Sequence, residues 1–494
     1  GSMGAMAAEP RIAGATIRVY GASGLLGSGT TGADGSYSIA LNTNAEATNQ
    51  VRVELQGWPA GYEPTRFGSS TGAMSANTNQ TTVRFVTFNG NTNNVNFGLQ
   101  RPGEYCQSNP NIAVTAFCGA NPLLAGLTTN VFSVFKSNYA SSTRTGAGYV
   151  QDTGSVNGVA WDPINNRVYT AAYVKRHAGL GSNGIGAVYS MNPSTNTTAF
   201  WFNVTSLGID IGQNNYNGTN PFPTNAARGL TANSVYSEDP VFDEVGKYGI
   251  GDIETNDVDT LYLTNLYGRT VHALPIPVGG GAPTSQTSLG MPGSAVTCTN
   301  GTARPLALTY KDGYVYAGLV CDAASGTRAD LDAYVVRTPA TGAGSGTWTQ
   351  FGPRIDLDYD KGPVFASAND QVTFANNRWN TWDSTFDNSW DPGTGNSTHS
   401  GGSRNDDYLF RPTPMLSDIE FDDDGSLILA FRDRTGDMLG SFNAPPNPED
   451  STGTYPFANT TSVSNPRLVH GMSGGDILRL CLVSGTYVID GAAG

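Results

Sequence analysis

The chain has 494 residues, enough to bury more than one core, with 62 glycines and only 14% charged residues. Its net charge of −14 disfavours duplex nucleic acid and anionic membranes as partners, since both are polyanions. The chain has no apolar run of about 18 residues, so membrane insertion is not predicted. Abundant glycine with Tyr and Phe predicts an all-β protein with many turns.

The first nine residues are interpreted as an expression scar, and residues 10–101 as one domain. Its segments ATIRVYGASG, GSYSIALNT, NQVRVELQG, TTVRFVTFNG and NNVNFGLQ alternate apolar and polar residues, as half-buried antiparallel strands do. Asp34-Gly35 supplies a hairpin turn between the first two of these strands. The pattern predicts a small immunoglobulin-like β-sandwich.

The order of AGATIRVYGASG, TTGADGSYSI, GWPAGYEPT and NVNFGLQ resembles the B-type domain of bacterial serine-aspartate-repeat and collagen-binding adhesins. The resemblance covers nearly all of residues 10–101. It implies a domain from the exposed region of a cell-surface protein.

Residues 102–126 are predicted to form a linker that is rich in Pro and flanked by cysteines. The five cysteines contain no C-x-x-C pair, so the sequence gives no support for a zinc site. Two disulfides are expected, Cys106–Cys118 and Cys298–Cys321, which leaves Cys481 over. Disulfides indicate an oxidising compartment, although reduced buried thiols are an open alternative.

Residues 127–494 repeat one pattern loosely: an apolar strand, an acidic or glycine turn, and a second apolar strand that ends in a polar cluster. The pattern recurs in GVAWDPINNRVYTAAY, GDIETNDVDTLYLTNLYGRTVHALPI, PLALTYKDGYVYAGLV and SDIEFDDDGSLILAFRDR. Imperfect recurrence of this kind is typical of β-propeller blades. Six blades are favoured within a range of five to seven, and a second sandwich is the alternative.

The segments AAYVKRHAGLGSNGIGAVY, YGIGDIETNDVDTLYLTNLYGRTVHAL, LSDIEFDDDGSLILAFRDRTGD and GGDILRLC resemble bacterial surface proteins in which a B-type domain precedes a propeller. That resemblance implies a secreted, surface-anchored protein and part of a longer chain. It implies no established enzymatic activity.

A basic cluster ends the first repeat, at Lys175, Arg176 and His177, and Arg432 and Arg434 end the last. The literal G-x-G-x-x-G of residues 179–184 is not a phosphate loop, because a strand rather than a helix follows it. The five basic residues are candidate ligand-binding groups at one mouth of the propeller.

Acidic pairs occupy matching places in two repeats, Asp252 with Glu254 and Asp418 with Glu420. In one interpretation they form salt bridges with the basic cluster, because buried charges need partners. In the other they supply oxygen ligands from separate blades to a Ca²⁺ ion.

An insertion rich in Asn and aromatic residues carries Trp379, Trp382 and Trp390. Exposed tryptophans are unfavourable unless they have a function, so these three either pack inside the protein or contact a ligand. Packing against the propeller is favoured over a stacking surface for carbohydrate.

The favoured function is therefore non-catalytic: the extracellular, cell-surface region of an adhesin, whose propeller recognises a carbohydrate or protein ligand. A calcium-dependent propeller hydrolase is one alternative. A structural stalk component without a specific ligand is the other.

Overall fold

A computed structural model gives the architecture of the chain. It describes residues 12–41, 50–59, 62–64, 82–87, 92–93, 95–100, 111–124, 132–138, 144–231, 239–365, 373–374, 377–386, 390, 406–422, 424–440, 443–446 and 468–490. The chain divides into two compact units, residues 1–110 and 111–494.

The predicted linker is too long at its C-terminal side. Strand β7 (Asn111–Thr115) lies inside it and pairs with β8 (Phe132–Asn138) of the second unit. The segment around this short strand is rich in Pro, Asn and Cys, a composition that is typical of a linker.

The first unit is built on a four-stranded antiparallel sheet in the order β2-β1-β3-β5. Its strands are β1 (Thr16–Gly21), β2 (Gly24–Thr30), β3 (Gln50–Gly57) and β5 (Val83–Thr87), and a second sheet pairs β4 (Glu63–Pro64) with β6 (Leu99–Gln100). Alternate residues of β1 and β3 form the core, and Tyr37, Ile39 and Phe97 pack over them as a second layer. Residues 36–41, predicted as a strand, fill that layer without joining a sheet.

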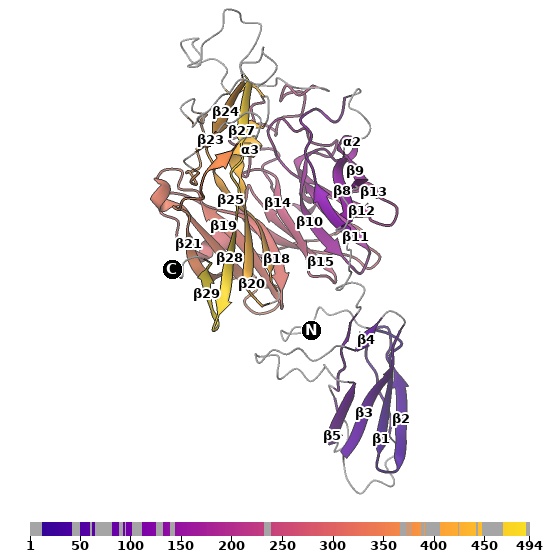
Figure 1. Ribbon diagram of the computed structural model, residues 1–494. Coiled ribbons are helices and arrows are strands. Elements are labelled where there is room, and N and C mark those ends of the chain that lie inside the picture. Colours follow the sequence, from indigo (N-terminus) through magenta and orange to yellow (C-terminus); the bar gives the residue numbers. More distant parts are fainter. Residues whose placement is uncertain are drawn as a thin grey trace, which may run out of the picture. The chain divides into compact units, whose positions relative to one another are not determined.

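The second unit contains four four-stranded antiparallel sheets and a three-stranded one (Figure 1). The three-stranded sheet joins β7 and β8 to β9 (Arg144–Tyr149). The four-stranded sheets are β10 (Val156–Asp162), β11 (Arg167–Ala172), β12 (Ala187–Asn192) and β13 (Thr197–Asn203); β14 (Ile250–Thr255), β15 (Thr260–Asn265), β16 (Thr270–Pro275) and β17 (Thr287–Ser288); β18 (Ala303–Lys311), β19 (Tyr314–Cys321), β20 (Asp332–Pro339) and β21 (Thr349–Asp356); and β25 (Pro414–Phe421), β26 (Leu427–Asp433), β28 (Asp476–Val483) and β29 (Thr486–Ile489).

Smaller elements connect these sheets. They are β22 (Val364–Phe365) paired with β23 (Thr373–Phe374), β24 (Asp406–Phe410) parallel to β27 (Leu468–Met472), helices α2 (Val150–Thr153) and α3 (Arg434–Leu439), and the 3₁₀ turns η2 (Gly184–Gly186), η3 (Val204–Leu207), η4 (Pro292–Ala295) and η5 (Arg328–Asp330). No helix in the described ranges is long and apolar enough to cross a membrane.

The first strands of successive sheets lie against one another: β7 against β10, β10 against β14, β14 against β18, and β18 against β25. This is the arrangement of a β-propeller, and it confirms the predicted class of fold. The described residues form five such sheets. That number falls within the predicted range but is one fewer than the six that were favoured.

Each four-stranded sheet has a bulge in its first strand. The register shifts between Asn157 and Val159 in β10, between Ile250 and Ile253 in β14, between Pro305 and Ala307 in β18, and between Leu416 and Asp418 in β25. A bulge bends a strand and redirects its side chains. Asp252 and Asp418 therefore lie at or next to equivalent bends of two blades.

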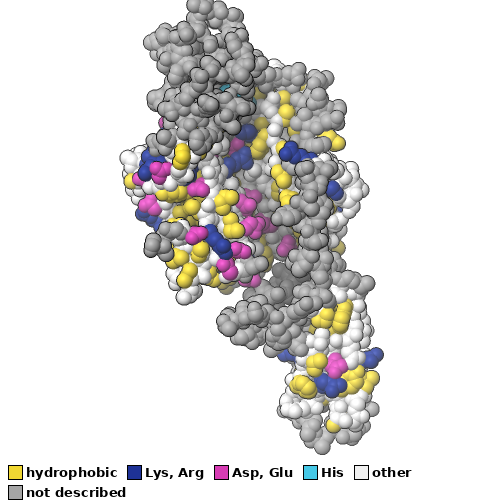
Figure 2. Space-filling view, viewed as in Figure 1, with side chains coloured by type: hydrophobic (Ala, Val, Ile, Leu, Met, Phe, Trp, Pro, Cys, Tyr) yellow, Lys and Arg dark blue, Asp and Glu magenta, His cyan; other side chains and the backbone are white. Residues whose placement is uncertain are grey.

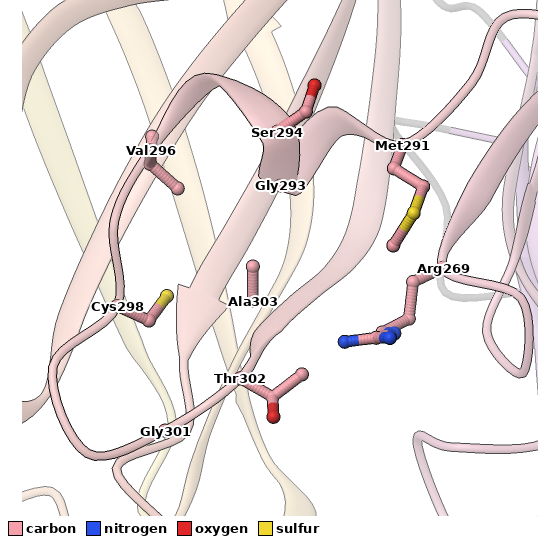
Figure 3. Close-up of a pocket in the computed structure, with 9 residues that line it drawn as sticks. All are labelled: Arg269, Met291, Gly293, Ser294, Val296, Cys298, Gly301, Thr302 and Ala303. Atoms are coloured by element: carbon pink, nitrogen blue, oxygen red, sulfur yellow. The ribbon is translucent and has the colours of Figure 1, made fainter.

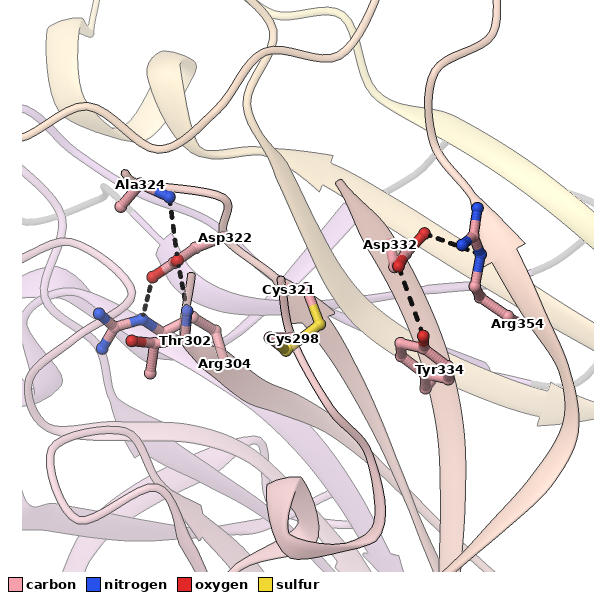
Figure 4. Close-up of a disulfide and its surroundings, with 9 residues drawn as sticks. All are labelled: Cys298, Thr302, Arg304, Cys321, Asp322, Ala324, Asp332, Tyr334 and Arg354. Atoms are coloured by element: carbon pink, nitrogen blue, oxygen red, sulfur yellow. Dashed lines mark hydrogen bonds and ion pairs between the residues drawn. A yellow bond between two sulfur atoms is a disulfide. The ribbon is translucent and has the colours of Figure 1, made fainter. Parts of the chain in front are cut away.

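The predicted disulfide between Cys298 and Cys321 is present, with Cα atoms 5.3 Å apart (Figure 4). It fastens the loop that enters β18 to the end of β19. Cys118 carries a free thiol, so the predicted bridge to it is not formed, and Cys106 lies outside the described residues. Cys481 is also free.

Removing this disulfide should destabilise the propeller. Because the bridge closes a loop with a sequence separation of 23, replacing Cys298 and Cys321 together by Ala is expected to lower the free energy of unfolding by about 3 kcal/mol. Guanidinium denaturation under non-reducing conditions measures the change. Cys481→Ala is the matched control, and a double variant as stable as this control would contradict the prediction.

Candidate functional site

The predicted basic cluster is organised by an acid from α3. Asp437 Oδ1 lies 2.6 Å from Lys175 Nζ and 2.7 Å from Arg432 Nη2, and the Tyr173 hydroxyl donates to Asp437 Oδ2 at 3.1 Å. Burial by itself raises the pKa of Asp437, but Lys175 and Arg432 outweigh it and hold the pKa below its ordinary value. One carboxylate thus neutralises two cations from different blades.

Arg176 and His177 are buried and belong to the structure of the loops. The Arg176 guanidinium donates from Nε to the carbonyl oxygen of Asp239 at 2.7 Å and from Nη2 to that of Ala444 at 3.0 Å. The amide of His177 donates to Asp239 Oδ2, which also pairs with Arg228, both at 2.7 Å. Burial, and then the charge of Arg176, lower the pKa of His177 well below its ordinary value, so its ring is neutral.

Arg434 is likewise fully buried. Its Nε donates to the carbonyl oxygen of Val245 at 2.8 Å, Nη2 lies 3.0 Å from Asp243 Oδ1, and the guanidinium stacks on Trp382. Arg176, His177 and Arg434 are therefore corrected from ligand-binding to structural residues. Among the predicted basic residues only Lys175 and Arg432 keep some side-chain exposure, 17% and 26%.

The three tryptophans are packed inside the structure, with exposures of 0%, 3% and 5% for Trp379, Trp382 and Trp390. The indole of Trp382 donates to the carbonyl oxygen of Pro414 at 2.9 Å, and Trp390 stacks on Phe242. The favoured packing interpretation agrees with this burial. Their assignment as a carbohydrate-stacking surface is corrected, because buried rings offer a ligand no face.

The four predicted acidic residues do come together. Asp252 and Glu254 of β14 and Asp418 and Glu420 of β25 affect one another electrostatically, from blades that flank β18 on both sides. We call these four residues the axial carboxylate group. Figure 2 shows acidic side chains gathered near the middle of the propeller face.

Proximity and burial shift the acidity of this group. Burial raises the pKa of Asp252 well above its ordinary value, and the charge of Asp418 raises it further. Burial raises the pKa of Glu254 to about 8, with a contribution from Glu420. The pKa values of Asp418 and Glu420 are also raised, first by burial. Glu254 therefore holds a proton at neutral pH beside carboxylates that are more open to solvent.

The predicted salt bridges between the axial carboxylate group and the basic cluster are not formed. Within the described ranges no ion pair involves any of the four carboxylates. Two of them accept hydrogen bonds from backbone amides instead: Asp252 accepts from Ile253 and Leu308, both at 2.9 Å, and Asp418 accepts from Ile419 at 2.8 Å.

Solvent reaches this group unevenly. Asp252 is 7% exposed and Glu254 is half-buried, whereas Asp418 and Glu420 are exposed. On the β10 side, Gly158 lies so close that an added Cβ would stand 3.3 Å from Asp252 Oδ1. The group thus has a closed side at β10 and β14 and an open side at β25.

The residues present do not fit the predicted calcium ion. Among the residues that the structure describes, no group of three acidic, histidine or cysteine side chains is placed to hold a metal. Ca²⁺ needs six to eight oxygen ligands around one point.

Sequence reasoning missed the acids that hold the basic residues. Asp437 lies in α3 only three residues beyond Arg434, and Asp239 and Asp243 lie in the long insertion before β14. The segment SEDPVFDEV carries four acids, two on each side of buried Val241 and Phe242. That mixture of charge and apolar residues was the one signal of a buried ionic loop.

Comparison with known proteins gives distant similarities. No family model matches the chain. It is 26% identical to Colossin-C of Dictyostelium discoideum over 300 residues, which is 60% of this chain and 25% of that protein, and 22% identical to Colossin-B over 445 residues, 85% of this chain and 10% of that protein. The chain thus spans a quarter or less of the length of these relatives.

Similar solved structures include a GH43 β-1,3-galactosidase, at 9% identity and a TM-score of 0.32, covering 78% of this chain and 91% of that one. Another is an auxiliary nutrient binding protein from Bacteroides ovatus, at 12% identity and a TM-score of 0.27, covering 86% and 88%. These distant similarities do not identify a ligand or a reaction, so the properties of the site are argued from the residues of this chain alone.

Loss of the shared counter-ion should destabilise the propeller. Asp437→Asn leaves Lys175 and Arg432 without their acid, and we expect a decrease of about 3 kcal/mol in the free energy of unfolding. Asp356→Asn is the control, since Asp356 and its partner Arg354 are 58% and 52% exposed and such pairs contribute about 0–1 kcal/mol. Equal effects in chemical denaturation would refute the assignment.

The raised pKa of Glu254 predicts a pH-dependent stability. The folded state keeps this proton up to about pH 8, whereas the unfolded chain releases it near pH 4.3. Stability should therefore fall as pH rises between these values, because the folded state binds more protons there. Glu254→Gln should flatten this dependence in unfolding curves taken across that range, and parallel curves for both proteins would contradict it.

Proposed function

We propose that the propeller is a non-catalytic recognition module of an extracellular protein, and that it binds carbohydrate at the axial carboxylate group. The observation that carries the proposal is a set of four carboxyl groups from two blades without an ion pair in the described ranges, two of them exposed.

Hydrogen-bonding capacity favours a polyhydroxyl ligand. Carboxyl oxygens accept hydrogen bonds, so the exposed Asp418 and Glu420 suit neighbouring sugar hydroxyls. Protonated Glu254 both donates and accepts, as a hydroxyl does. The concentration of acidic groups disfavours an anionic ligand at this place.

An exposed aromatic residue lies on β10, the strand beside β14. Trp161 in β10 is 41% exposed, and its carbonyl oxygen accepts from the Thr255 hydroxyl, one residue beyond Glu254. Indole faces pack well against apolar surfaces, and the C–H face of a sugar ring is one. Trp161, and not the buried tryptophans, is therefore the residue that we propose to stack on a sugar ring.

An adhesin at the cell surface is the cellular setting that we propose. The Cys298–Cys321 disulfide is typical of proteins outside the reducing cytoplasm. The net charge of −14 keeps such a domain soluble and away from anionic surfaces, so a surface carbohydrate is favoured over nucleic acid.

Glycoside hydrolysis is a second candidate, because Glu254 has the raised pKa of a proton donor. Such enzymes place a protonated acid and an ionised carboxylate on opposite sides of the scissile bond. In this chain Asp418 or Glu420 would be the ionised partner. The two functions differ in one respect: a hydrolase consumes its ligand.

A glycan array with the purified chain tests the proposal. We expect selective binding that Asp418→Asn and Glu420→Gln each weaken about tenfold or more, since each removes charged hydrogen-bond acceptors. Asp152→Asn, at an exposed acid of α2, is the control.

The array also separates the alternatives. Release of reducing sugar from bound glycans, lost in Glu254→Gln, identifies a hydrolase, and binding that requires added Ca²⁺ restores the calcium hypothesis. Absence of any glycan binding would contradict the proposal and would agree with the alternative of a structural stalk component.

A further inference from the structure

A separate pocket lies between two blades, away from the axial carboxylate group. It has a volume of about 290 Å³ and is bounded by the turn between β15 and β16, by η4, and by the start of β18. Figure 3 shows the Arg269 side chain reaching toward Thr302 and Ala303, with Met291 beside it.

Arg269 is the only ionisable side chain in the lining, because the one cysteine there, Cys298, is in a disulfide. The structure gives Arg269 no ion pair or hydrogen bond with the residues it describes. The neighbouring arginine, Arg304, is by contrast paired with Asp322 at 2.8 Å, and that carboxylate also accepts from the amides of Thr302 and Ala324 (Figure 4). Asp322, which borders the pocket at Thr302, is thus already neutralised.

The backbone holds Arg269 in an unfavourable conformation. Its φ is +55°, in the left-handed region where most side chains are strained. Most of the other non-glycine residues with positive φ are Asn or Asp, which tolerate that region. Glycine would adopt this backbone conformation with less strain than arginine does. The turn nevertheless carries an arginine, and its guanidinium points toward the pocket.

We propose that this pocket binds the oxyanion of an acidic ligand, of the size of one acidic sugar residue. A guanidinium makes paired hydrogen bonds to carboxylate, sulfate or phosphate oxygens. Ser294 and Thr302 add hydroxyl-bearing residues to the lining, and Met291 adds an apolar one. The volume lies at the lower limit of small-molecule pockets, which are about 300–1,000 Å³.

The pocket and the axial carboxylate group carry opposite charges and suit different ligands. That group is acidic and suits neutral polyhydroxyl ligands, whereas this pocket carries an uncompensated positive charge. Each can exist without the other, so failure of the proposed function at the axis leaves this inference standing.

Titration with glucuronate, followed by ligand-observed NMR, tests the pocket. Wild type should bind glucuronate in preference to glucose, and Arg269→Gln should weaken binding about tenfold or more. Arg269→Gly should do the same while raising the thermal midpoint, since glycine relieves the positive φ. Arg167→Gln, at an arginine whose guanidinium contacts only backbone carbonyls of its own turn, is the control for charge.

Inorganic sulfate distinguishes an oxyanion site from one that needs a carboxylate. Competition by sulfate shows that the guanidinium recognises oxyanions in general, and its failure while glucuronate still requires Arg269 shows selectivity for carboxylate. Asp418→Asn should leave glucuronate binding unchanged. Glucuronate binding that survives Arg269→Gln, or no binding of either anion, overturns the inference.

Discussion

Burying a guanidinium or ammonium group is tolerated only when acceptors surround it, and the propeller meets this demand with acids from its loops. Asp437 takes the charges of Lys175 and Arg432, and Asp239 takes that of Arg228 while its backbone accepts from Arg176. Because these loops neutralise the basic cluster locally, none of its cations forms an ion pair with the axial carboxylate group within the described residues, and only the charge of Lys311 partly offsets the rise in the pKa of Glu420. The axial carboxylate group therefore keeps its own charges in mutual contact.

The bulges in the first strands bring the acidic side chains of two blades together. A regular strand would alternate its side chains between the two faces of a blade. The register shifts at Asp252 and at Asp418 bend β14 and β25 at equivalent points, and the acids of both strands then meet across β18. Burial on the β14 side keeps a proton on Glu254, while the β25 side stays open to solvent. The result is a polar surface that both donates and accepts hydrogen bonds.

The sequence predicted the β-propeller and put Asp252 and Asp418 at matching places of two repeats, because the strand-turn-strand pattern recurs; it did not establish that the acidic pairs converge. It could not predict the partners of the basic residues. Asp437 and Asp239 lie in a helix and a loop whose positions depend on tertiary packing, and spacing along the chain carries no signal for that. The tryptophans illustrate the same limit, since Trp379 and Trp382 are enclosed by chain segments distant in sequence. Arg269 also escaped notice, because only its place beside the disulfide-linked loop makes it a candidate.

The central claim is that Glu254 of the axial carboxylate group holds a proton at neutral pH, because burial and the neighbouring acids raise its pKa. Infrared difference spectroscopy of the carboxylic C=O stretch, comparing wild type with Glu254→Gln at pH 7, measures this directly. The account predicts a protonated-carboxyl band in wild type that decreases in the variant and titrates near pH 8. A fully ionised group at pH 7, with identical spectra for both proteins, would contradict it.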